Sequence, residues 1–304
     1  METNMNSEQP SVKISPRSDK AILLVTFGST FPDAHRTFSA MRKYFAHAFD
    51  KHDVYMAFTS TTCIERWFAK SGERFFTPDV WLEALAEAGC RHITVQSLHV
   101  IPGREYAKIT EEYLPAFHIR HPETSIAVGR PLLWDDADID AVANGLYDIF
   151  RPSLDKGEAL VLMGHGSPSS AGREANGQYV RLAHSLQRLS DLIFLGTVDF
   201  KPMLLSCLLD EMAKKVPLGT PVHLAPLMSV AGDHALNDMA GMPDDDADDD
   251  DQSWMVQLQR AGYVVDVSRH CHLQGLGDHP AMCALWENHL RNAVSFTSHP
   301  ESDV

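Results

Sequence analysis

The sequence has few of the features that mark secreted, membrane or nucleotide-binding proteins. Its five cysteines never form a Cys-x-x-Cys pair, which argues against both a disulfide framework and a structural zinc site. No stretch approaches the ~20 uninterrupted apolar residues that span a bilayer. Neither a GxxxxGK[ST] loop nor a complete GxGxxG after a strand is present, so we expect no nucleotide cofactor.

Positive charge is also scarce. The 304 residues include 26 Lys and Arg against 41 Asp and Glu, a formal net charge of −15. An acidic chain without a basic stripe is a poor candidate for binding nucleic acid. Seven aspartates form the run Asp244–Asp251, broken only by Ala247. We interpret this run as a solvated surface loop, with a weak collector of divalent cations as the alternative.

The start of the chain is polar and contains no apolar h-region. We therefore expect residues 1–19 to be a disordered leader, and we expect the protein to be cytoplasmic and to have no membrane partner. The oligomeric state is left open, a homo-oligomer included.

From residue 20 onward, short β-branched apolar runs alternate with amphipathic helical segments. This alternation is typical of βαβ units and a parallel sheet. Strands are expected at residues 21–27, 54–58, 92–98, 125–128, 159–163, 192–198, 222–226 and 263–267, with long helices at 32–49, 173–189 and 280–294. The pattern predicts two α/β domains, residues 20–135 and 136–297, the second containing an acidic loop at 241–252.

The two predicted domains resemble each other in sequence. Residues 21–30 match 159–168 at a shift of 138 residues, and 95–106 match 224–235 at a shift of 129. A weaker match sets 58–59 against 198–199. The matches predict two similar Rossmann-like domains, each a parallel sheet flanked by helices. A cleft for a large ligand is expected between them, beyond the carboxyl ends of the strands.

Two histidines fall at such strand ends. His165 lies between two glycines directly after a buried apolar run, and His234 follows Gly232 after another. Imidazole binds cobalt, nickel, iron and zinc, and it takes up a proton near neutral pH. Metal insertion into a porphyrin-like ring needs both properties, because the metal must be held above the ring and two pyrrole N–H protons must leave. Most of the sixteen histidines are expected to be surface or packing residues, so position alone singles out these two.

Three aspartates lie close to these histidines in the sequence. Asp199, at the end of a predicted strand, is a candidate third ligand or proton acceptor, with an ordinary loop aspartate as the alternative. Asp233 and Asp238 could orient His234 as carboxylates behind the ligand, or could cap the helix that begins there.

Four segments resemble the anaerobic-pathway cobalt chelatases, the sirohydrochlorin cobaltochelatases of the class II chelatase group. They are LVTFGST (24–30), QSLHVIPGREY (96–106), MGHG (163–166) and PLMSVAGDHALNDMA (226–240). The resemblance runs in order from about residue 20 to residue 294. It implies two similar α/β domains around a tetrapyrrole cleft and ATP-independent insertion of Co²⁺ into sirohydrochlorin, on the oxygen-independent route to cobalamin. It implies no organic cofactor, with Co²⁺ as the substrate metal.

The resemblance also assigns roles to residues. The metal-binding histidines of the family fall on His165 and His234. A metal-ligand glutamate of the family falls on Asp199, whose carboxylate is one methylene shorter and needs either a backbone shift or a bridging water. The choice of cobalt rests on the resemblance, since the same ligands accept Fe²⁺ or Ni²⁺. A chelatase for another metal and a non-catalytic tetrapyrrole or metal carrier therefore stay as alternatives.

The substrate carries several carboxylates, which an acidic protein must bind through locally placed cations or backbone amides. The candidate cations near the predicted strand ends are Arg66, Arg104, Lys108 and Lys201. The predicted substrate-binding residues on the first-domain wall are Phe27, Gly28, Phe58, Arg104 and Glu105. For the two phenylalanines, core packing is the alternative.

Overall fold

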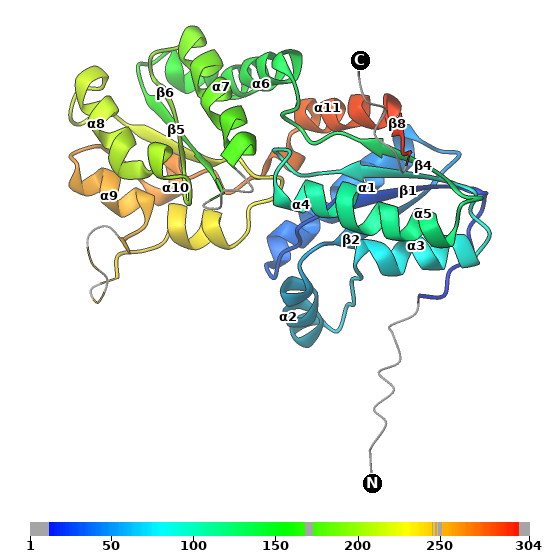
Figure 1. Cartoon of the computed structure of the whole chain (residues 1–304). Helices are drawn as coiled ribbons and strands as arrows, with labels where there is room; N and C mark the ends of the chain where they lie inside the picture. Colours follow the sequence, from blue (N-terminus) through cyan, green and yellow to red (C-terminus); the bar gives the residue numbers. More distant parts are fainter. Residues whose placement is uncertain (1–11, 168–172, 245, 247, 249–250, 298–304) are drawn as a thin grey trace.

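Two sheets, each covered by helices, form the two halves of the molecule (Figure 1). The computed structural model describes residues 12–167, 173–244, 246, 248 and 251–297. The strands are β1 (Lys20–Thr26), β2 (Asp53–Phe58), β3 (His92–Ser97), β4 (Ser125–Gly129), β5 (Ala159–Gly164), β6 (Ile193–Thr197), β7 (Val222–Pro226) and β8 (Val294–Ser295). The first sheet has the order β2-β1-β3-β4-β8 and the second the order β6-β5-β7, and all pairings except β4 with β8 are parallel.

Helices connect the strands as the alternating pattern predicts. They are α1 (Pro32–Ala48), α2 (Thr61–Ser71), α3 (Pro78–Glu87), α4 (Arg104–Ala107), α5 (Leu114–Arg120), α6 (Asp136–Leu154), α7 (Arg173–Leu189), α8 (Leu205–Lys215), α9 (Trp254–Arg260), α10 (Val267–His270) and α11 (Pro280–Arg291), with π-helical turns η1 (Lys108–Tyr113) and η4 (His234–Met239). Within the described residues, no helix combines the length and apolar character that a membrane crossing requires.

Alternate residues of the central strands face opposite layers of helices. Leu24 of β1 packs with α1 and α11 on one face, whereas Leu23 packs with α3 and α5 on the other. In the second sheet, Leu162 of β5 packs with α6 and α7, and Val161 packs with α8 and α9. The first core cluster contains residues of both sheets, with α6 between them, so the two halves share one continuous hydrophobic core.

The predicted duplication agrees with the topology, because β1 lies between β2 and β3 as β5 lies between β6 and β7. The amide of Leu98 donates to Val25, and the matching amide of Leu227 donates to Met163. The weaker match is wrong by one residue. Gly164 is the counterpart of Thr26 in the second half. Phe58 pairs with Thr26 and Thr197 pairs with Gly164, so Phe58 corresponds to Thr197. The hydrogen-bond register therefore aligns residues 59–60 with 198–199.

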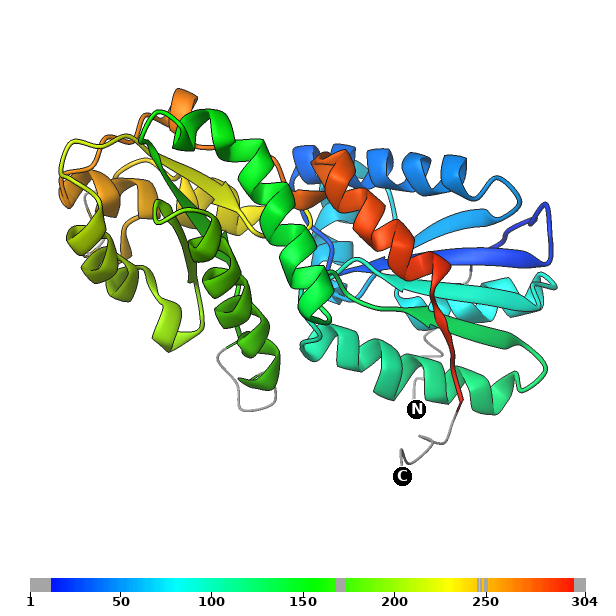
Figure 2. The ribbon, with the colours of Figure 1, turned by 90° about the horizontal axis from the view of Figure 1, so that it is seen from above.

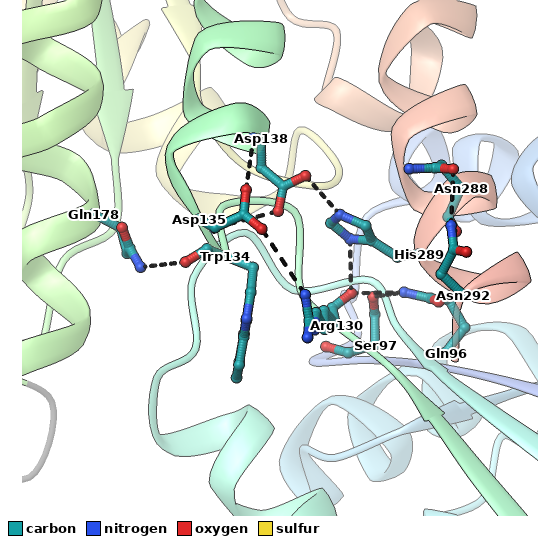
Figure 3. Close-up of polar contacts among 10 residues, drawn as sticks. All are labelled: Gln96, Ser97, Arg130, Trp134, Asp135, Asp138, Gln178, Asn288, His289 and Asn292. Atoms are coloured by element: carbon teal, nitrogen blue, oxygen red, sulfur yellow. Dashed lines mark hydrogen bonds and ion pairs between the residues drawn. The ribbon is translucent and has the colours of Figure 1, made fainter. Parts of the chain in front are cut away.

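The end of the chain returns to the first half, which corrects the expected boundary at 136–297. Helix α11 packs on β3, β4 and α1, and β8 pairs antiparallel with β4. Figure 2 shows α11 beside α6, between the two sheets. His289 of α11 fixes this crossing, because its Nε2 lies 2.8 Å from Oδ1 of Asp138 and its Nδ1 lies 3.2 Å from the carbonyl oxygen of Arg130 (Figure 3).

The strand expected at residues 263–267 is also wrong. Val264 makes only an isolated parallel bridge with Pro221, and the helix α10 begins at Val267. Asp266 ends the extended stretch, because its side chain accepts the amide protons of Ser268 and Arg269 and so caps this helix.

Candidate active site

His165 is delivered to the edge of the second sheet by β5, a strand with no exposed residue. A side chain at either flanking glycine would be too close to a different neighbouring group. A Cβ on Gly164 would lie 2.8 Å from Cε1 of Tyr179, a ring that packs against the strand end. Gly166 has φ +79° and its Cβ would lie 2.8 Å from the backbone nitrogen of Phe200. The tight turn that these glycines allow leaves the His165 side chain 49% exposed.

His234 begins η4, the turn that follows β7, at the equivalent edge of the same sheet. Ala235 and Met239 of this turn are buried and hold it against the core, while His234 stays partly exposed. Gly232 lies directly against the first half, since a Cβ there would be 3.3 Å from Oγ of Ser29. The backbone before His234 therefore lies at the contact between the two halves.

The structure brings these two predicted histidines together. Their ring centroids are 4.6 Å apart and the ring planes are perpendicular. Nδ1 of His165 lies 2.8 Å from the carbonyl oxygen of Gly166, and Nδ1 of His234 lies 2.5 Å from Oδ2 of Asp238. Because both partners are acceptors, each Nδ1 must donate, which leaves the lone pair of a neutral imidazole on Nε2. Both rings are thus in the tautomer that binds a metal through Nε2.

The two aspartates that could orient His234 make different contacts. Asp238 contacts His234, whereas Oδ1 of Asp233 accepts from Nδ2 of Asn237 at 2.6 Å. Asp233 does stand at the N-cap position of η4, but its side chain accepts no capping hydrogen bond. Of the two, only Asp238 lies where a carboxylate orients the imidazole.

Asp199 lies beside His165 but on the side of Nδ1. Its amide donates to the carbonyl oxygen of His165 at 2.9 Å, and its Oδ2 lies 3.6 Å from His165 Nδ1. No group of three His, Cys, Asp or Glu side chains in the described ranges is placed to hold a metal ion by itself. A role for Asp199 at the metal therefore stays a prediction, either as a direct ligand after a movement or through a bridging water.

On the first-half wall, Phe27 and Phe58 have opposite environments. Phe27, the counterpart of His165, is 49% exposed at the end of β1 and is available for contact with a flat ligand. Phe58 is 0% exposed and stacks on Phe75 with ring centroids 4.1 Å apart. The expectation that Phe58 contacts the substrate is therefore wrong in this structure, because its ring is sealed in the aromatic core. Gly28 has φ +104°, and its Cβ would lie 2.8 Å from Cδ2 of Phe58.

Glu105, the counterpart of His234, lies at the start of α4. Its Oε1 accepts from Nζ of Lys108 at 2.8 Å, and both side chains are mostly buried. Burial raises the pKa of Glu105, but the hydrogen bond and charge of Lys108 outweigh burial and hold that pKa below its usual range. Lys108 is therefore engaged by Glu105, whereas Arg66, Arg104 and Lys201 are exposed at the surface.

His99 is a residue of this wall that the sequence reasoning missed. Its Nδ1 lies 2.9 Å from Oγ of Ser97, and its Nε2 is buried without a hydrogen-bond partner. Burial lowers the pKa of His99 to about 4; the charge of Glu105 opposes this shift and that of Lys108 adds to it, so the imidazole is neutral at pH 7. The available signal was its place in the segment 95–106, which matches the segment of His234.

The acidic run lies partly outside the described residues, since residues 245, 247, 249 and 250 are not among them. The described members Asp244, Asp246, Asp248 and Asp251 are exposed. The amide of Asp244 donates to Oε1 of Gln252 at 3.0 Å, and Nε2 of Gln252 donates back to the Asp244 carbonyl oxygen. These bonds close the base of a surface loop, in keeping with the solvated-loop interpretation.

The family model for cobalt chelatase (CbiK) matches residues 20–295, which is most of the chain. The chain belongs to the CbiK cobalt chelatase family. Among curated relatives of this chelatase, the sirohydrochlorin cobaltochelatase of Salmonella typhimurium is 34% identical over 280 residues, covering 91% of this chain and 97% of the relative. The sirohydrochlorin cobaltochelatase CbiKC of Nitratidesulfovibrio vulgaris is 31% identical over 286 residues, covering 92% of each chain.

Solved structures agree with this chelatase in fold. SirB from Bacillus subtilis with Fe³⁺ has a TM-score of 0.56 at 18% identity, covering 90% of this chain and 94% of that chain. SirB from Bacillus subtilis subspecies spizizenii in complex with cobalt has a TM-score of 0.54 at 16% identity, covering 93% and 97%. At such identities the likeness concerns the fold alone, which is the expected pair of α/β halves.

Proposed function

We propose that this chelatase inserts Co²⁺ into sirohydrochlorin without ATP and without an organic cofactor. The observation that carries the proposal is the pair His165 and His234, whose Nδ1 atoms are both occupied by acceptors while their rings lie 4.6 Å apart. Two unprotonated Nε2 atoms, at the carboxyl ends of strands in one sheet, can bind a borderline divalent cation and then release it.

The proton balance also fits two imidazoles. Insertion of Co²⁺ into the free tetrapyrrole releases two protons from the pyrrole nitrogens. As cobalt leaves the protein, each Nε2 regains its lone pair, so His165 and His234 can accept these protons. Asp238 stabilises the cationic form of His234 at that moment, since its carboxylate is already hydrogen-bonded to Nδ1.

The remaining site residues have supporting roles in this proposal. Asp199, 3.6 Å from His165, assists the metal through a water or after a small shift. The exposed ring of Phe27 contacts the macrocycle from the first half. The exposed cations Arg66, Arg104 and Lys201 are the candidates for binding its carboxylates.

The test is a cobalt-insertion assay on purified protein, followed by the change in the tetrapyrrole absorption spectrum. We expect more than one turnover per chain, and His165→Ala and His234→Ala should each abolish insertion while the fold is retained. Asp199→Ala should reduce the rate less than either histidine change. Near-normal turnover by either folded histidine variant would remove that residue from the mechanism.

Two alternatives have distinct outcomes in the same assay. A pure tetrapyrrole or metal carrier would stop at one turnover per chain. A chelatase for another metal would insert Fe²⁺ or Ni²⁺ faster than Co²⁺ when the metals compete, because two imidazoles and a carboxylate accept all three.

A further inference from the structure

A second group of histidines lies at the opposite end of the second sheet from His234. His223 is the second residue of β7, at its amino end, and Glu158 directly precedes β5. His270 and His272 belong to the segment that leaves α10. At ~3.3 Å per residue, the length of β7 from His223 to Pro226 alone places about 10 Å of strand between this cluster and the start of the His234 loop.

Hydrogen bonds order three of these side chains in a row. Nε2 of His223 lies 2.8 Å from Oε2 of Glu158, and Nδ1 of His223 lies 2.9 Å from Nε2 of His272. Because a carboxylate accepts, His223 donates through Nε2, and the lone pair of the neutral ring is on Nδ1. This lone pair is directed at His272.

The backbone holds the two imidazoles in place. The amide of His272 donates to the carbonyl oxygen of Leu224 at 2.8 Å, and Cys271 bridges Leu224 in parallel register. The side chain of His223 is only 8% exposed, and the ring of Phe150 lies edge-on to His272 with centroids 5.0 Å apart. The pair is therefore built into the fold rather than formed by two mobile surface side chains.

The His272 ring is suited to binding metal at neutral pH. Burial, together with the neighbouring His223, His270 and His279, lowers the pKa of His272 to about 4. Burial and His223 also lower the pKa of His270, although Glu158 and Asp266 oppose this change. Neutral imidazole is the form that binds transition metals.

We propose that His223 and His272 form a second site for a borderline divalent cation such as Co²⁺, Ni²⁺ or Zn²⁺. The cation would bind between Nδ1 of His223 and Nε2 of His272, in the place of the proton that Nε2 now donates. That proton would move to Nδ1 of His272. Tetrahedral bonds of ~2.0–2.1 Å require the nitrogens to separate from 2.9 Å to about 3.3 Å. Glu158 would accept the hydrogen bond from Nε2 of His223 and so orient this ring toward the metal.

Water completes the coordination shell in this proposal. Throughout the described part of the chain, no third His, Cys, Asp or Glu joins such a pair to complete a metal site. His270 flanks the pair, but its Nδ1 accepts the amide proton of Asp266 at 2.9 Å, which leaves its own proton on Nε2. His272 and His279 line a cavity of about 160 Å³, from which we expect water to reach the cation. The site therefore binds its ion exchangeably.

The test uses the full chain in which His165→Ala and His234→Ala remove the site proposed for chelation. Equilibrium dialysis against Co²⁺, Ni²⁺ or Zn²⁺ should leave one ion per chain in this double variant. Adding His272→Ala should abolish that binding, and adding Glu158→Gln should weaken it by about 10–100-fold. The matched control is His92→Ala, an exposed histidine of the first half, which should change nothing.

Circular dichroism verifies the fold of each variant, and His272→Gln repeats the test with less loss of volume. If the double variant binds no ion, or if both His272 variants keep its affinity, the second site does not exist. Cobalt insertion by the double variant would instead contradict the proposed chelation mechanism, so the two failures are distinguishable.

Discussion

The hydrogen bond between His234 and Asp238 is expected to control metal affinity, and Asp238→Asn tests this. The change keeps the size of the side chain but removes the charge that accepts from Nδ1 at 2.5 Å. The asparagine NH2 group can donate to Nδ1, and His234 then holds the other tautomer, in which Nε2 carries the proton and cannot bind the metal. The Asp238 side chain is 46% exposed, so the substitution should leave the fold unchanged.

Loss of a carboxylate behind a metal-binding histidine typically costs 10–100-fold in metal affinity. We therefore expect Co²⁺ affinity at this site to fall by this factor, equivalent to about 1.4–2.8 kcal/mol. The affinity is measured by titration with Co²⁺, following its absorption bands, in a His272→Ala background that removes the second proposed site. The cobalt-insertion rate at low metal concentration should fall in parallel.

Asp233→Asn is the matched control, because Asp233 is five residues nearer the N-terminus than Asp238 and contacts Asn237 instead of the imidazole. This variant should retain affinity close to that of the original sequence. Equal losses in both variants would mean that general negative charge, rather than orientation of His234, sets the affinity. Unchanged Co²⁺ affinity in the Asp238→Asn variant would mean that Asp238 does not orient His234 for metal binding.

Two further predictions concern the strand-end glycine and the buried histidine. Gly166→Ala should lower the free energy of unfolding by at least about 1–2 kcal/mol, because the residue has φ +79° and its Cβ would meet the Phe200 amide; an unchanged urea midpoint would contradict this. The folded-state pKa of His99 is about 4 against an ordinary value of 6.5, so the unfolded chain binds more protons between these values and stability should fall as the pH drops through this window. His99→Gln should flatten that dependence in urea unfolding at pH 7 and pH 4.5, and an equally steep loss would exclude His99 as its source.

The sequence predicted the arrangement of the strands well because strand patterning and motif order are local properties. The apolar runs 21–27 and 159–163 located β1 and β5, and the equivalence of the segments containing Leu98 and Leu227 is present in the hydrogen-bond register. The neighbouring positions of His165 and His234 followed from the rule that parallel strands end at one sheet edge.

Other features depend on tertiary contacts that no local pattern records. Phe58 is buried against Phe75, which lies outside its strand, so the sequence of the strand alone could not show that Phe58 is buried while Phe27 is exposed. The return of α11 to the first half depends on side-chain packing and on the contacts of His289 with Arg130 and Asp138. Each of these partners is more than 150 residues away from His289 in the sequence. The distinction between Asp233 and Asp238 is local by contrast, because Asp238 follows His234 by four residues and the helical turn places residue i+4 beside the imidazole.

In the proposed mechanism, His165 and His234 hold the cobalt that enters the ring. To measure this directly, the His272→Ala protein is loaded with one equivalent of Co²⁺ and mixed rapidly with sirohydrochlorin and an excess of a strong chelator. We expect the protein-bound cobalt to appear in the tetrapyrrole spectrum in a single turnover, and we expect His165→Ala and His234→Ala to prevent this transfer. Capture of all bound cobalt by the chelator, with a metal-free tetrapyrrole remaining, would contradict this mechanism.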